Sequence, residues 1–503
     1  MSLAELSITS RKSDLARLQS FLVGEALTAS TGAKINYHFK ESLGDINLTD
    51  PLWKMPQKGV FTEDFTQDLL QMKTDMVVHS WKDLPTEKKD SLQIAASLPR
   101  ADQRDLLLIK KSSVARILKN KKINLFSSSP RRFYNVEPLL KSCFPFGLNE
   151  VHFESVRGNI PTRLNKLIAA ENIDGLILAK AAMDRLILTA VPELQETQKH
   201  VIQILALMNW MVLPLSENPN AAAQGAIAIE INSNNSEVLH TLQKINDPET
   251  FFCAEKERLV LSSYGGGCHQ KIGIAYLKHT YGHIQFLKGL TVSGVLLDQK
   301  ILIHPALDKI KHKFNPELMW SDSNSNKYFD RRDKNWTVNS QHPAFFVTKA
   351  SCVGPDSVAK LNEAVVWTAG VATWKKLAGL GVWVNGTQDG LGENIPMRLE
   401  SLVLARTEWH KLTHEASGEG ISCYELKRNE IQFDFKNKEC FYWNSASLFL
   451  TAAQEHPSIL NKIHCCGPGN SADIIKNHLG SESLWKNLFI FYNQEQWSSH
   501  VSR

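Results

Sequence analysis

Short apolar runs alternate with amphipathic stretches through most of the first 230 residues, and this alternation constrains the fold more than any other feature. Three of the apolar runs lie at 75–80, 105–109 and 175–179. Leu15, Leu18 and Leu22 have the three- to four-residue spacing of a helix that buries one face. Strand-length runs alternating with helices predict an α/β fold with parallel or mixed sheets. Functional groups are then expected where strands end, as in other α/β proteins.

The chain has 503 residues, too many for one hydrophobic core, and typical domain sizes predict three or four domains. Hydrophobic residues make up 43% and charged residues 22%, which excludes the disordered and fibrous classes. The formal net charge of +5 is spread thinly, so no nucleic-acid partner is expected. Because the start lacks a basic-then-apolar leader and no run of about 18 apolar residues occurs, the sequence predicts a cytoplasmic protein without a membrane partner.

Eight cysteines are scattered without a CxxC pair, which is typical of reduced thiols, so no disulfide and no metal site is expected. Cys465 and Cys466 follow His464, but neighbouring side chains of an extended segment point in opposite directions, which favours structural thiols over metal ligands. Cys268 differs because it directly follows the three glycines at 265–267. Glycine frees the backbone and allows a close approach, which predicts that Cys268 attaches a covalently held group.

Five polar clusters in the first half stand where predicted strands meet turns or helices. They lie at 10–13, 79–85, 127–132, 157–163 and Arg185. In the third cluster, Ser129 is a suitable N-cap and Pro130 a suitable first helical residue, so Arg131 and Arg132 would flank an anion-attracting helix N-terminus. A single surface arginine is more often a solvated charge. Five clusters together predict a ligand with many carboxylates, because guanidinium groups bind carboxylates through paired hydrogen bonds.

Asp83 is an acidic residue beside Lys82 among these basic groups. One interpretation is a structural ion-pair partner within the cluster. The other is a general acid or base that also stabilises a cation in an anion-binding cleft. The residues alone leave both open.

Nine segments, in collinear order, resemble the signatures of the porphobilinogen deaminase family, also called hydroxymethylbilane synthases. They are RKSDLARLQ, KGVF (58–61), VHSWKDLPTE, DQRD (102–105), SSSPRR, VRGNIPTRLNKL, DGLILAKAAMDRL, AAAQGAIAIE (221–230) and GGGCHQKIG. The resemblance covers roughly residues 5 to 300. It implies two α/β lobes similar to periplasmic binding proteins, the second inserted into the first, and a small α+β domain carrying the cysteine. It also implies a transferase of heme biosynthesis that joins four porphobilinogen units with loss of ammonia and releases hydroxymethylbilane.

Residue by residue, the resemblance implies that Cys268 forms a thioether to a dipyrromethane cofactor and that Asp83 and Lys82 are catalytic. Each pyrrole ring carries an acetate and a propionate, which fits the polycarboxylate expected from the basic clusters. The positions matching the family's substrate-binding residues are Arg11, Ser13, Phe61, Lys82, Ser127, Arg157, Arg163 and Arg185. Those matching cofactor-binding residues are Asp83, Ser129, Arg131 and Arg132.

In the C-terminal part, a strand candidate at 364–368 leads into a helix from Gly370, and the segment at 467–480 repeats the design. Either two copies of one module or a chance similarity of glycine-rich helix entries explains this. VVWTAGVATWKKLAGLG and FYWNSASLFLTAAQ, with HCCGPGNSADIIKNHLG, resemble the uroporphyrinogen III synthase family, which closes the linear tetrapyrrole in a cleft between two α/β lobes. The matching cleft positions are Thr368, Thr373, Ser445, Ser447, Gly467 and Asn470.

The expected domains are 1–100 with 197–220, 101–196, 221–304, a polar linker at 305–344, and 345–503. Together the resemblances predict a monomeric bifunctional enzyme, a deaminase fused to a synthase of the lyase class, with the small-molecule substrates porphobilinogen and hydroxymethylbilane. Two alternatives stay open. The C-terminal domain is degenerate and only packs against the deaminase, or the chain is a non-catalytic solute-binding protein whose lobes share the general fold.

Overall fold

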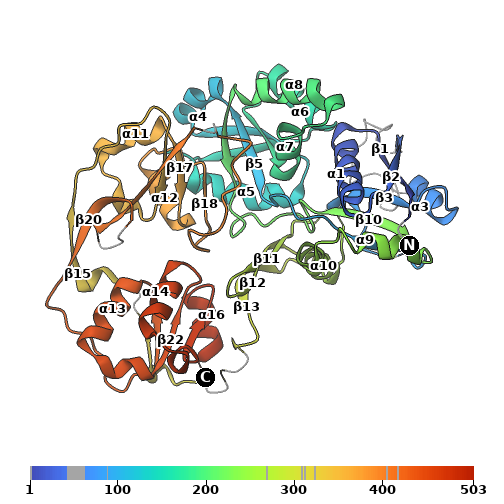
Figure 1. Cartoon of the computed structure of the whole chain (residues 1–503). Helices are drawn as coiled ribbons and strands as arrows, with labels where there is room; N and C mark the ends of the chain where they lie inside the picture. Colours follow the sequence, from blue (N-terminus) through green and yellow to red (C-terminus); the bar gives the residue numbers. More distant parts are fainter. Residues whose placement is uncertain are drawn as a thin grey trace. The chain divides into compact units, whose positions relative to one another are not determined.

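The computed structural model describes residues 3–41, 63–87, 89–267, 270–307, 310, 313–321, 325–403, 406–415 and 419–502. The chain divides into two compact mixed α/β units (Figure 1). The first unit comprises Met1–Lys141, Leu148–Tyr276 and Leu287–Asp298, and the second comprises Ser142–Gly147, Leu277–Phe286 and Gln299–Arg503. Among the helices within these described ranges, none is long and apolar enough to cross a membrane.

Lobe A of the first unit is a five-stranded sheet with strand order β2-β1-β3-β10-β4. Its strands are β1 (Glu5–Arg11), β2 (Lys34–Lys40), β3 (Met76–Ser80), β4 (Leu92–Ala96) and β10 (Ile227–Asn232). Its helices are α1 (Asp14–Thr31), α3 (Glu63–Leu70) and α9 (Ser236–Leu242). β1 runs parallel to β2 and β3, whereas β10 runs antiparallel to β3 and β4. The core joins Ile8 and Val78 of the sheet to Val23 and Leu27 of α1.

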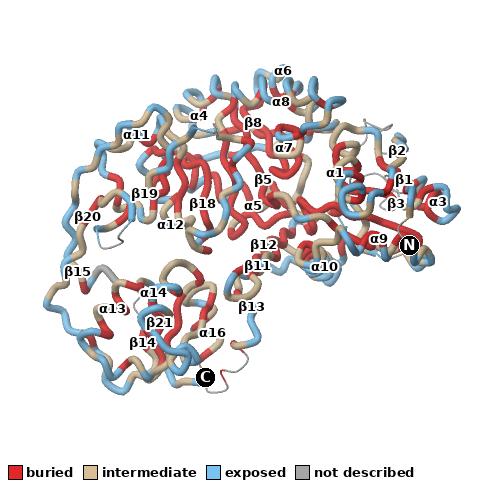
Figure 2. The backbone as a smooth tube through the Cα atoms, viewed as in Figure 1, coloured by how far each residue is buried: buried red, intermediate tan, exposed pale blue. Residues whose placement is uncertain are grey.

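Lobe B is a second five-stranded sheet, with strand order β7-β6-β8-β5-β9. Its strands are β5 (Asp105–Lys110), β6 (Lys122–Phe126), β7 (Glu150–Glu154), β8 (Gly175–Ala179) and β9 (Met208–Val212). Its helices are α4 (Val114–Asn120), α5 (Pro130–Cys143), α6 (Ile160–Ala169), α7 (Lys180–Ile187) and α8 (Gln195–Leu205). The central strands β5 and β8 are buried almost throughout (Figure 2). Burial on both faces explains their continuous apolar sequences.

The chain passes between lobes A and B twice, and the second passage corrects the expected domain boundaries. β9 pairs with β5 in lobe B, and the chain returns to lobe A only at β10. The segment 197–220, expected in the first domain, therefore supplies α8 and β9 to lobe B. The segment expected to open the third domain supplies β10 to lobe A. Strand pairing across long sequence separations decides this arrangement, and the local pattern of apolar residues does not encode it.

The rest of the chain up to residue 303 forms α10 (Pro248–Ser263) and a three-stranded sheet of order β11-β12-β13. These strands are β11 (Gly273–His279), β12 (Gly282–Leu290) and β13 (Leu296–Ile303). Glu257 of α10 is fully buried and accepts hydrogen bonds from both terminal nitrogens of Arg100, at 2.9 and 2.7 Å, and from the Ala223 amide at 2.7 Å. Glu257 thus ties α10 to both passages between lobes A and B.

The second unit contains two further sheets. Lobe C has strand order β15-β20-β19-β16-β17-β18, and lobe D has order β14-β21-β22-β23 with all strands parallel. Lobe C consists of β15 (Phe329–Asp333), β16 (Pro343–Val347), α11 (Val358–Asn362), β17 (Val365–Thr368), α12 (Val371–Gly379), β18 (Gly386–Thr387), β19 (Glu408–His414) and β20 (Ile421–Arg428). Lobe D consists of β14 (Met319–Ser321), β21 (Cys440–Trp443), α13 (Ala446–Glu455), β22 (Ile463–Cys466), α14 (Asn470–Leu479), α15 (Glu482–Trp485), β23 (Leu488–Ile490) and α16 (Gln494–Val501).

The expected linker at 305–344 is wrong, because it supplies β14 to lobe D and β15 to lobe C. Both are edge strands, and β15 is mostly exposed. The sequence pattern hid β15 because an edge strand tolerates charged residues, and it hid β14 because three residues are too few to show an apolar pattern. The two expected strand, glycine turn and helix modules are confirmed as β17 with α12 and β22 with α14.

Candidate active site

A pocket of lobe A brings together three predicted site residues: Arg11, Ser13 and Asp83. Arg11 ends β1, and Ser13 is the N-cap residue of α1, although its hydroxyl makes no cap hydrogen bond. Asp83 ends a short 3-10 helix, η2 (Trp81–Asp83), directly after β3, and its side chain is exposed. A guanidinium, a hydroxyl and the positive end of a helix therefore line the pocket together with one carboxylate, a combination suited to an anion that carries a reacting cationic group.

Lys82 is connected to lobe B through a chain of two hydrogen bonds. Its Nζ donates to Oε1 of Gln224 at 3.3 Å, and Gln224 Nε2 donates to Oδ1 of Asp105 at 2.9 Å. Burial lowers the pKa of Lys82, and the neighbouring Asp83 opposes that change. Burial disfavours the charged form of this ammonium group. A ligand carboxylate beside it would stabilise the charged form again, so Lys82 is suited to bind one.

Asp105, the first residue of β5, is the centre of a buried ionic cluster. Arg131 Nη2 donates to Oδ2 at 2.9 Å, and Arg132 donates from Nη2 to Oδ1 at 2.7 Å and from Nε to Oδ2 at 3.1 Å. Asn218 Nδ2 donates to Oδ2 at 2.9 Å, so with Gln224 the Asp105 carboxylate accepts five hydrogen bonds. Burial alone would raise the pKa of Asp105, but the guanidinium groups of Arg131 and Arg132 outweigh it and hold that pKa well below its ordinary value.

This cluster changes the sequence interpretation of the two arginines. Arg131 and Arg132 are buried and share one internal carboxylate, so they are not freely available to the ligand as the helix-entrance pattern implied. Two guanidinium groups against one carboxylate still leave one excess positive charge. The Nε of Arg131 is buried and has no hydrogen-bond partner in the part of the chain that the structure describes. Sequence reasoning missed Asp105, although the DQRD segment contained it.

The serines of the third cluster behave as the helix signal predicted. α5 begins at Pro130, and the Arg132 amide donates to the Ser129 hydroxyl at 3.5 Å, a long N-cap bond. Ser127 is buried, and its hydroxyl accepts from the Ser129 amide at 3.4 Å. Ser127 and Ser129 therefore shape the turn that carries the two arginines.

The fourth cluster opens α6, where Asn159 is the N-cap and accepts from the Thr162 amide at 2.9 Å. Arg163 Nε donates to the Gly158 carbonyl at 2.7 Å. Burial and the positive charge of Arg132 together lower the pKa of Arg163 to about 10, against the opposing effect of Asp83. Arg163 of lobe B therefore lies close enough to Asp83 of lobe A for their charges to interact.

Two other arginines differ in their surroundings. Arg157 has a buried Nη1 without a hydrogen-bond partner among the residues with described positions. Arg185 lies in the last turn of α7 and donates to the Gly225 carbonyl at 2.8 Å. Burial lowers the pKa of Arg185 to about 10, against the opposing effect of Asp184. Arg185 therefore braces the second passage between the lobes, and it does not stand at the strand exit where the sequence placed it.

The glycines before Cys268 use the backbone freedom that glycine provides. Gly265, Gly266 and Gly267 all have positive φ, at 95°, 63° and 95°. A Cβ on Gly266 would lie 2.4 Å from the Thr86 hydroxyl, so this loop passes directly beside the segment that follows Asp83. Cys268 itself, like Phe61, lies outside the described residues.

Arg258 of α10, which sequence reasoning did not single out, holds the segment around Asp83 from the other side. Its Nη1 donates to the carbonyls of Trp81 at 3.2 Å and Leu84 at 3.0 Å, and its Nη2 donates to the carbonyl of Pro85. The position of Asp83 thus depends on a side chain from α10, the helix that leads into the glycine loop.

The six residues matched to a synthase cleft lie at three turns of the second unit. The Thr368 hydroxyl is buried and donates to the Gly370 carbonyl at 3.2 Å, and the Thr373 hydroxyl donates to the Thr348 carbonyl at 3.4 Å. Ser445 is the N-cap residue of α13 without a cap hydrogen bond, and Ser447 lies in its first turn. The hydroxyls of the two threonines therefore donate hydrogen bonds within lobe C, whereas the Ser445 hydroxyl makes no cap hydrogen bond.

One loop of lobe C and one turn of lobe D approach each other closely at Gly390 and Gly469. A Cβ on Gly469 would lie 3.4 Å from the Gly390 carbonyl, and the Gly390 amide donates to the Ala369 carbonyl at 2.8 Å. The Glu393 amide donates to Oδ1 of Asn470 at 3.3 Å. Gly467 and Asn470 are thus brought toward the β17–α12 turn, on which Thr368 and Thr373 lie.

The comparisons with known proteins cover the first part of the chain. A family model described as "Porphobilinogen deaminase, dipyromethane cofactor binding domain" matches residues 6–240. A probable porphobilinogen deaminase of Picrophilus torridus is 34% identical over 294 residues, which cover 58% of this chain and 93% of the relative. The porphobilinogen deaminase of Caldicellulosiruptor saccharolyticus is also 34% identical, over 54% of this chain and 83% of the relative. A solved substrate-binding domain of GlnP from Lactococcus lactis covers 53% of this chain and 92% of its own length at 9% identity, but its TM-score of 0.28 supports no argument.

The matching relatives are covered almost completely, and the model that matches is the dipyrromethane cofactor-binding domain of the enzyme. The predicted cofactor and the predicted deaminase function in tetrapyrrole synthesis are therefore confirmed. The chain belongs to the porphobilinogen deaminase family.

Proposed function

We propose that Asp83 is the catalytic carboxylate of a reaction that joins four porphobilinogen units into linear hydroxymethylbilane, and that Cys268 carries the dipyrromethane. The observation that carries this proposal is the shared pocket of Arg11, Ser13 and Asp83, with Arg163 in electrostatic range of Asp83. The excess positive charge at Arg131 and Arg132 and their buried Asp105 fit a polycarboxylate cofactor. When bound, the dipyrromethane would supply the nucleophilic pyrrole carbon for the bond to the incoming substrate.

In this proposal, Arg11 and Ser13 bind a carboxylate of the incoming porphobilinogen. Asp83 stands beside its aminomethyl group and holds the proton that leaves with the amine. The C–N bond breaks, ammonia departs, and the pyrrole nitrogen lone pair stabilises the resulting methylene cation, which the Asp83 carboxylate faces. After the new C–C bond forms, Asp83 accepts the proton released from the carbon of the attacking pyrrole ring, so the carboxyl group is restored for the next unit.

The test of this role is Asp83→Asn, which keeps the shape of the side chain and removes its ionisable carboxyl group. Loss of a general acid or base costs about 10²- to 10⁴-fold in rate, so kcat for porphobilinogen consumption should fall by at least about 100-fold. Asp90→Asn, an exposed carboxylate seven positions along, is the matched control and should keep normal kcat. Normal turnover of Asp83→Asn would reduce Asp83 to the ion-pair partner that the sequence left open.

The attachment role of Cys268 has a separate test. Intact-mass spectrometry of the native chain should show an addition equal to two pyrrole units, and Cys268→Ser should lack it. A native chain without any addition would contradict the attachment and would favour the solute-binding alternative.

We further propose that the second unit closes the linear product to uroporphyrinogen III. The supporting observation is that two α/β lobes meet at the Gly390 and Gly469 segments, close to Asn470. The whole chain should convert porphobilinogen mainly to the type III isomer, separated after oxidation. Asn470→Ala should shift products toward type I, whereas Asn477→Ala on the exposed face of α14 should not. Only type I product from the native chain would favour a degenerate domain. That the enzyme acts as a cytoplasmic monomer stays a prediction.

A further inference from the structure

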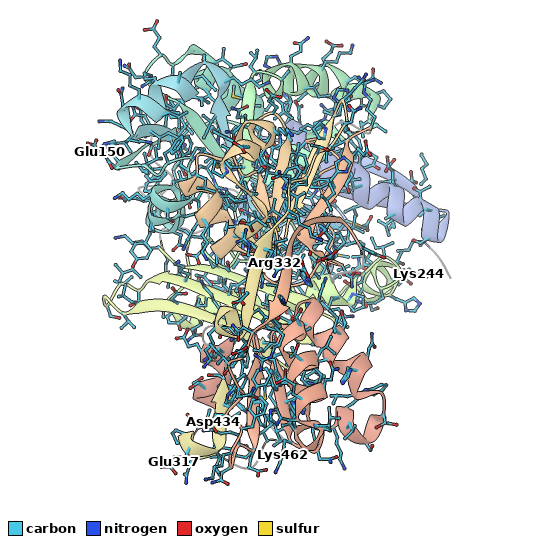
Figure 3. All side chains as sticks on the ribbon, turned by 90° about the vertical axis from the view of Figure 1, so that its left-hand side faces the viewer. Glu150, Lys244, Glu317, Arg332, Asp434 and Lys462 are labelled. Carbon is cyan, nitrogen blue, oxygen red and sulfur yellow. The ribbon has the colours of Figure 1, made fainter. Side chains whose placement is uncertain are left out.

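Lobe D contains a second pocket, at the edge of its sheet opposite the turns of the candidate cleft. It is lined by Phe433, Asp434, Phe435, Lys436, Lys438, His456, Ser458, Ile459 and Lys462. These residues precede β21 and β22, whereas the turns at Ser445 and Gly467 follow the same two strands. In a parallel sheet, the two ends of the strands lie at opposite edges. The pocket is therefore separate from the cleft, and Figure 3 shows Asp434 and Lys462 at the same end of this lobe.

One wall of the pocket is aromatic. The rings of Phe433 and Phe435 are stacked, with centroids 5.0 Å apart and an interplanar angle of 12°. The His456 ring meets the Phe435 ring edge-on at 5.2 Å. Phe433 is buried, but Phe435 is only half-buried although it lines a pocket. The Phe435 ring also meets the rings of Trp320 at 5.1 Å and Phe441 at 5.3 Å, so only its remaining surface lines the pocket as an apolar platform for a flat group.

The pocket also has positively charged residues, which are three lysines. Lys462 forms an ion pair with Glu439 at 2.6 Å, so its charge is already balanced. Lys438 Nζ donates to the Glu317 carbonyl at 2.6 Å, which positions its ammonium but leaves the charge uncompensated. The Lys436 ammonium has no hydrogen-bond or ion-pair partner within the described part of the chain. Among the lining residues, Lys436 and Lys438 therefore outnumber the one aspartate, Asp434, and the pocket favours an anion.

His456 supplies a further group. Its Nε2 is buried without a hydrogen-bond partner among the described residues, although the residue lines the pocket. Buried polar atoms are nearly always paired, so an unpaired one beside a pocket marks a place where a ligand oxygen or a bridging water belongs.

We propose that this pocket binds a small aromatic carboxylate, with its ring on Phe435 and its carboxylate on Lys436 and Lys438. The site is independent of the deaminase and of the proposed synthase cleft, so its failure would leave both functions untouched. A ring without a charge would lack the lysine contacts, and an aliphatic dianion would lack the aromatic platform. The ligand class thus requires both features at once.

The test is lysine footprinting of the full chain with an acetylating reagent, with phthalate as the probe. When phthalate is present at twice its dissociation constant, two thirds of the sites are filled, so acetylation of Lys436 should slow about threefold. Lys486, an exposed lysine of the same lobe, is the internal control and should react at an unchanged rate. Succinate carries the same charge without a ring and should need a concentration at least about threefold higher for equal protection.

Variants complete the test. Lys436→Ala should abolish the protection of Lys438 by phthalate while porphobilinogen consumption stays normal, and Lys486→Ala should change neither. Equal protection by succinate and phthalate would overturn the aromatic specificity. Unchanged acetylation of Lys436 at saturating phthalate, or equal slowing at Lys486, would overturn the site.

Discussion

The Arg132 guanidinium binds the Asp105 carboxylate in a bidentate manner: Nη2 donates to Oδ1 at 2.7 Å, and Nε donates to Oδ2 at 3.1 Å. Both residues are buried, and Arg131 shares the same carboxylate. The two guanidinium groups therefore have fixed positions and keep one excess positive charge between them. Preorganised donors of this kind lose little entropy when a ligand binds.

Removing the shared carboxylate should be costly. Asp105→Asn leaves two buried guanidinium groups without their counter-ion, and breaking a buried ion pair in this way costs about 3–5 kcal/mol of unfolding free energy. Urea denaturation checks the value. Asp330→Asn removes an exposed carboxylate from β15 and should change the unfolding free energy by less than about 0.5 kcal/mol. An Asp105→Asn chain as stable as the native one would show that the cluster contributes no net stability.

Arg258 should act through the segment around Asp83. Arg258→Lys keeps the charge but cannot bond three carbonyls in the same fork, so Asp83 should lose its fixed position. A displacement near 1 Å costs up to about 100-fold in rate, so kcat should fall by about 10- to 100-fold while KM changes little. Steady-state kinetics measure both quantities. Lys256→Ala on the same helix should leave kcat normal, and an equal loss in both variants would point to general damage to α10.

Gly225 should resist substitution because of the chain passage in which it lies. Its φ is +88°, and a Cβ would lie 2.7 Å from the Ala101 carbonyl oxygen, a backbone atom that cannot rotate away. Gly225→Ala should lower the unfolding free energy by at least about 1 kcal/mol. The matched control is Gly354→Ala, since no atom lies within 4 Å of that Cβ and its φ is negative. Equal thermal midpoints for the two variants would contradict the predicted strain.

His464 should make the second unit sensitive to acid. Trp443 Nε1 donates to its Nδ1 at 3.0 Å, an arrangement that only the neutral ring permits, and burial lowers the pKa of His464 to about 4. The ordinary pKa of histidine is about 6.5, so between these values the unfolded chain binds the proton and the folded chain does not. Stability contributed by His464 is therefore complete above about pH 6.5 and falls as the pH drops toward 4, by about 3 kcal/mol in total.

Urea unfolding followed by tryptophan fluorescence at several pH values measures this loss. His464→Gln keeps an oxygen acceptor for Trp443 and removes the titrating group, so its stability should decline less between about pH 6.5 and pH 4. His478→Gln removes an exposed histidine of the same lobe and should follow the native curve. Parallel curves for the native chain and His464→Gln would assign the acid sensitivity to other groups.

Local sequence signals predicted much of what was found. The apolar runs became β3, β5 and β8, and the N-cap and proline signals placed the start of α5 at Pro130. The three glycines before Cys268 predicted an unrestricted backbone, and Gly265, Gly266 and Gly267 adopt positive φ. These features depend on neighbours a few residues apart, so steric and hydrogen-bonding preferences of the residues suffice to determine them.

The partners of these groups were decided only by the tertiary structure. The sequence does not show that Asp105 neutralises Arg131 and Arg132, that Arg258 holds the carbonyls around Asp83, or that β10 returns to lobe A. It also hid the three-residue strand β14 and the mostly charged strand β15, both of which form at sheet edges by pairing with a longer strand. Each of these depends on contacts between residues distant in the chain, where burial removes water and makes pairing between specific charges and backbone groups decisive. The sequence by itself determined the chemical groups and their local turns, and the tertiary structure decided which groups are paired internally and which stay available to a ligand.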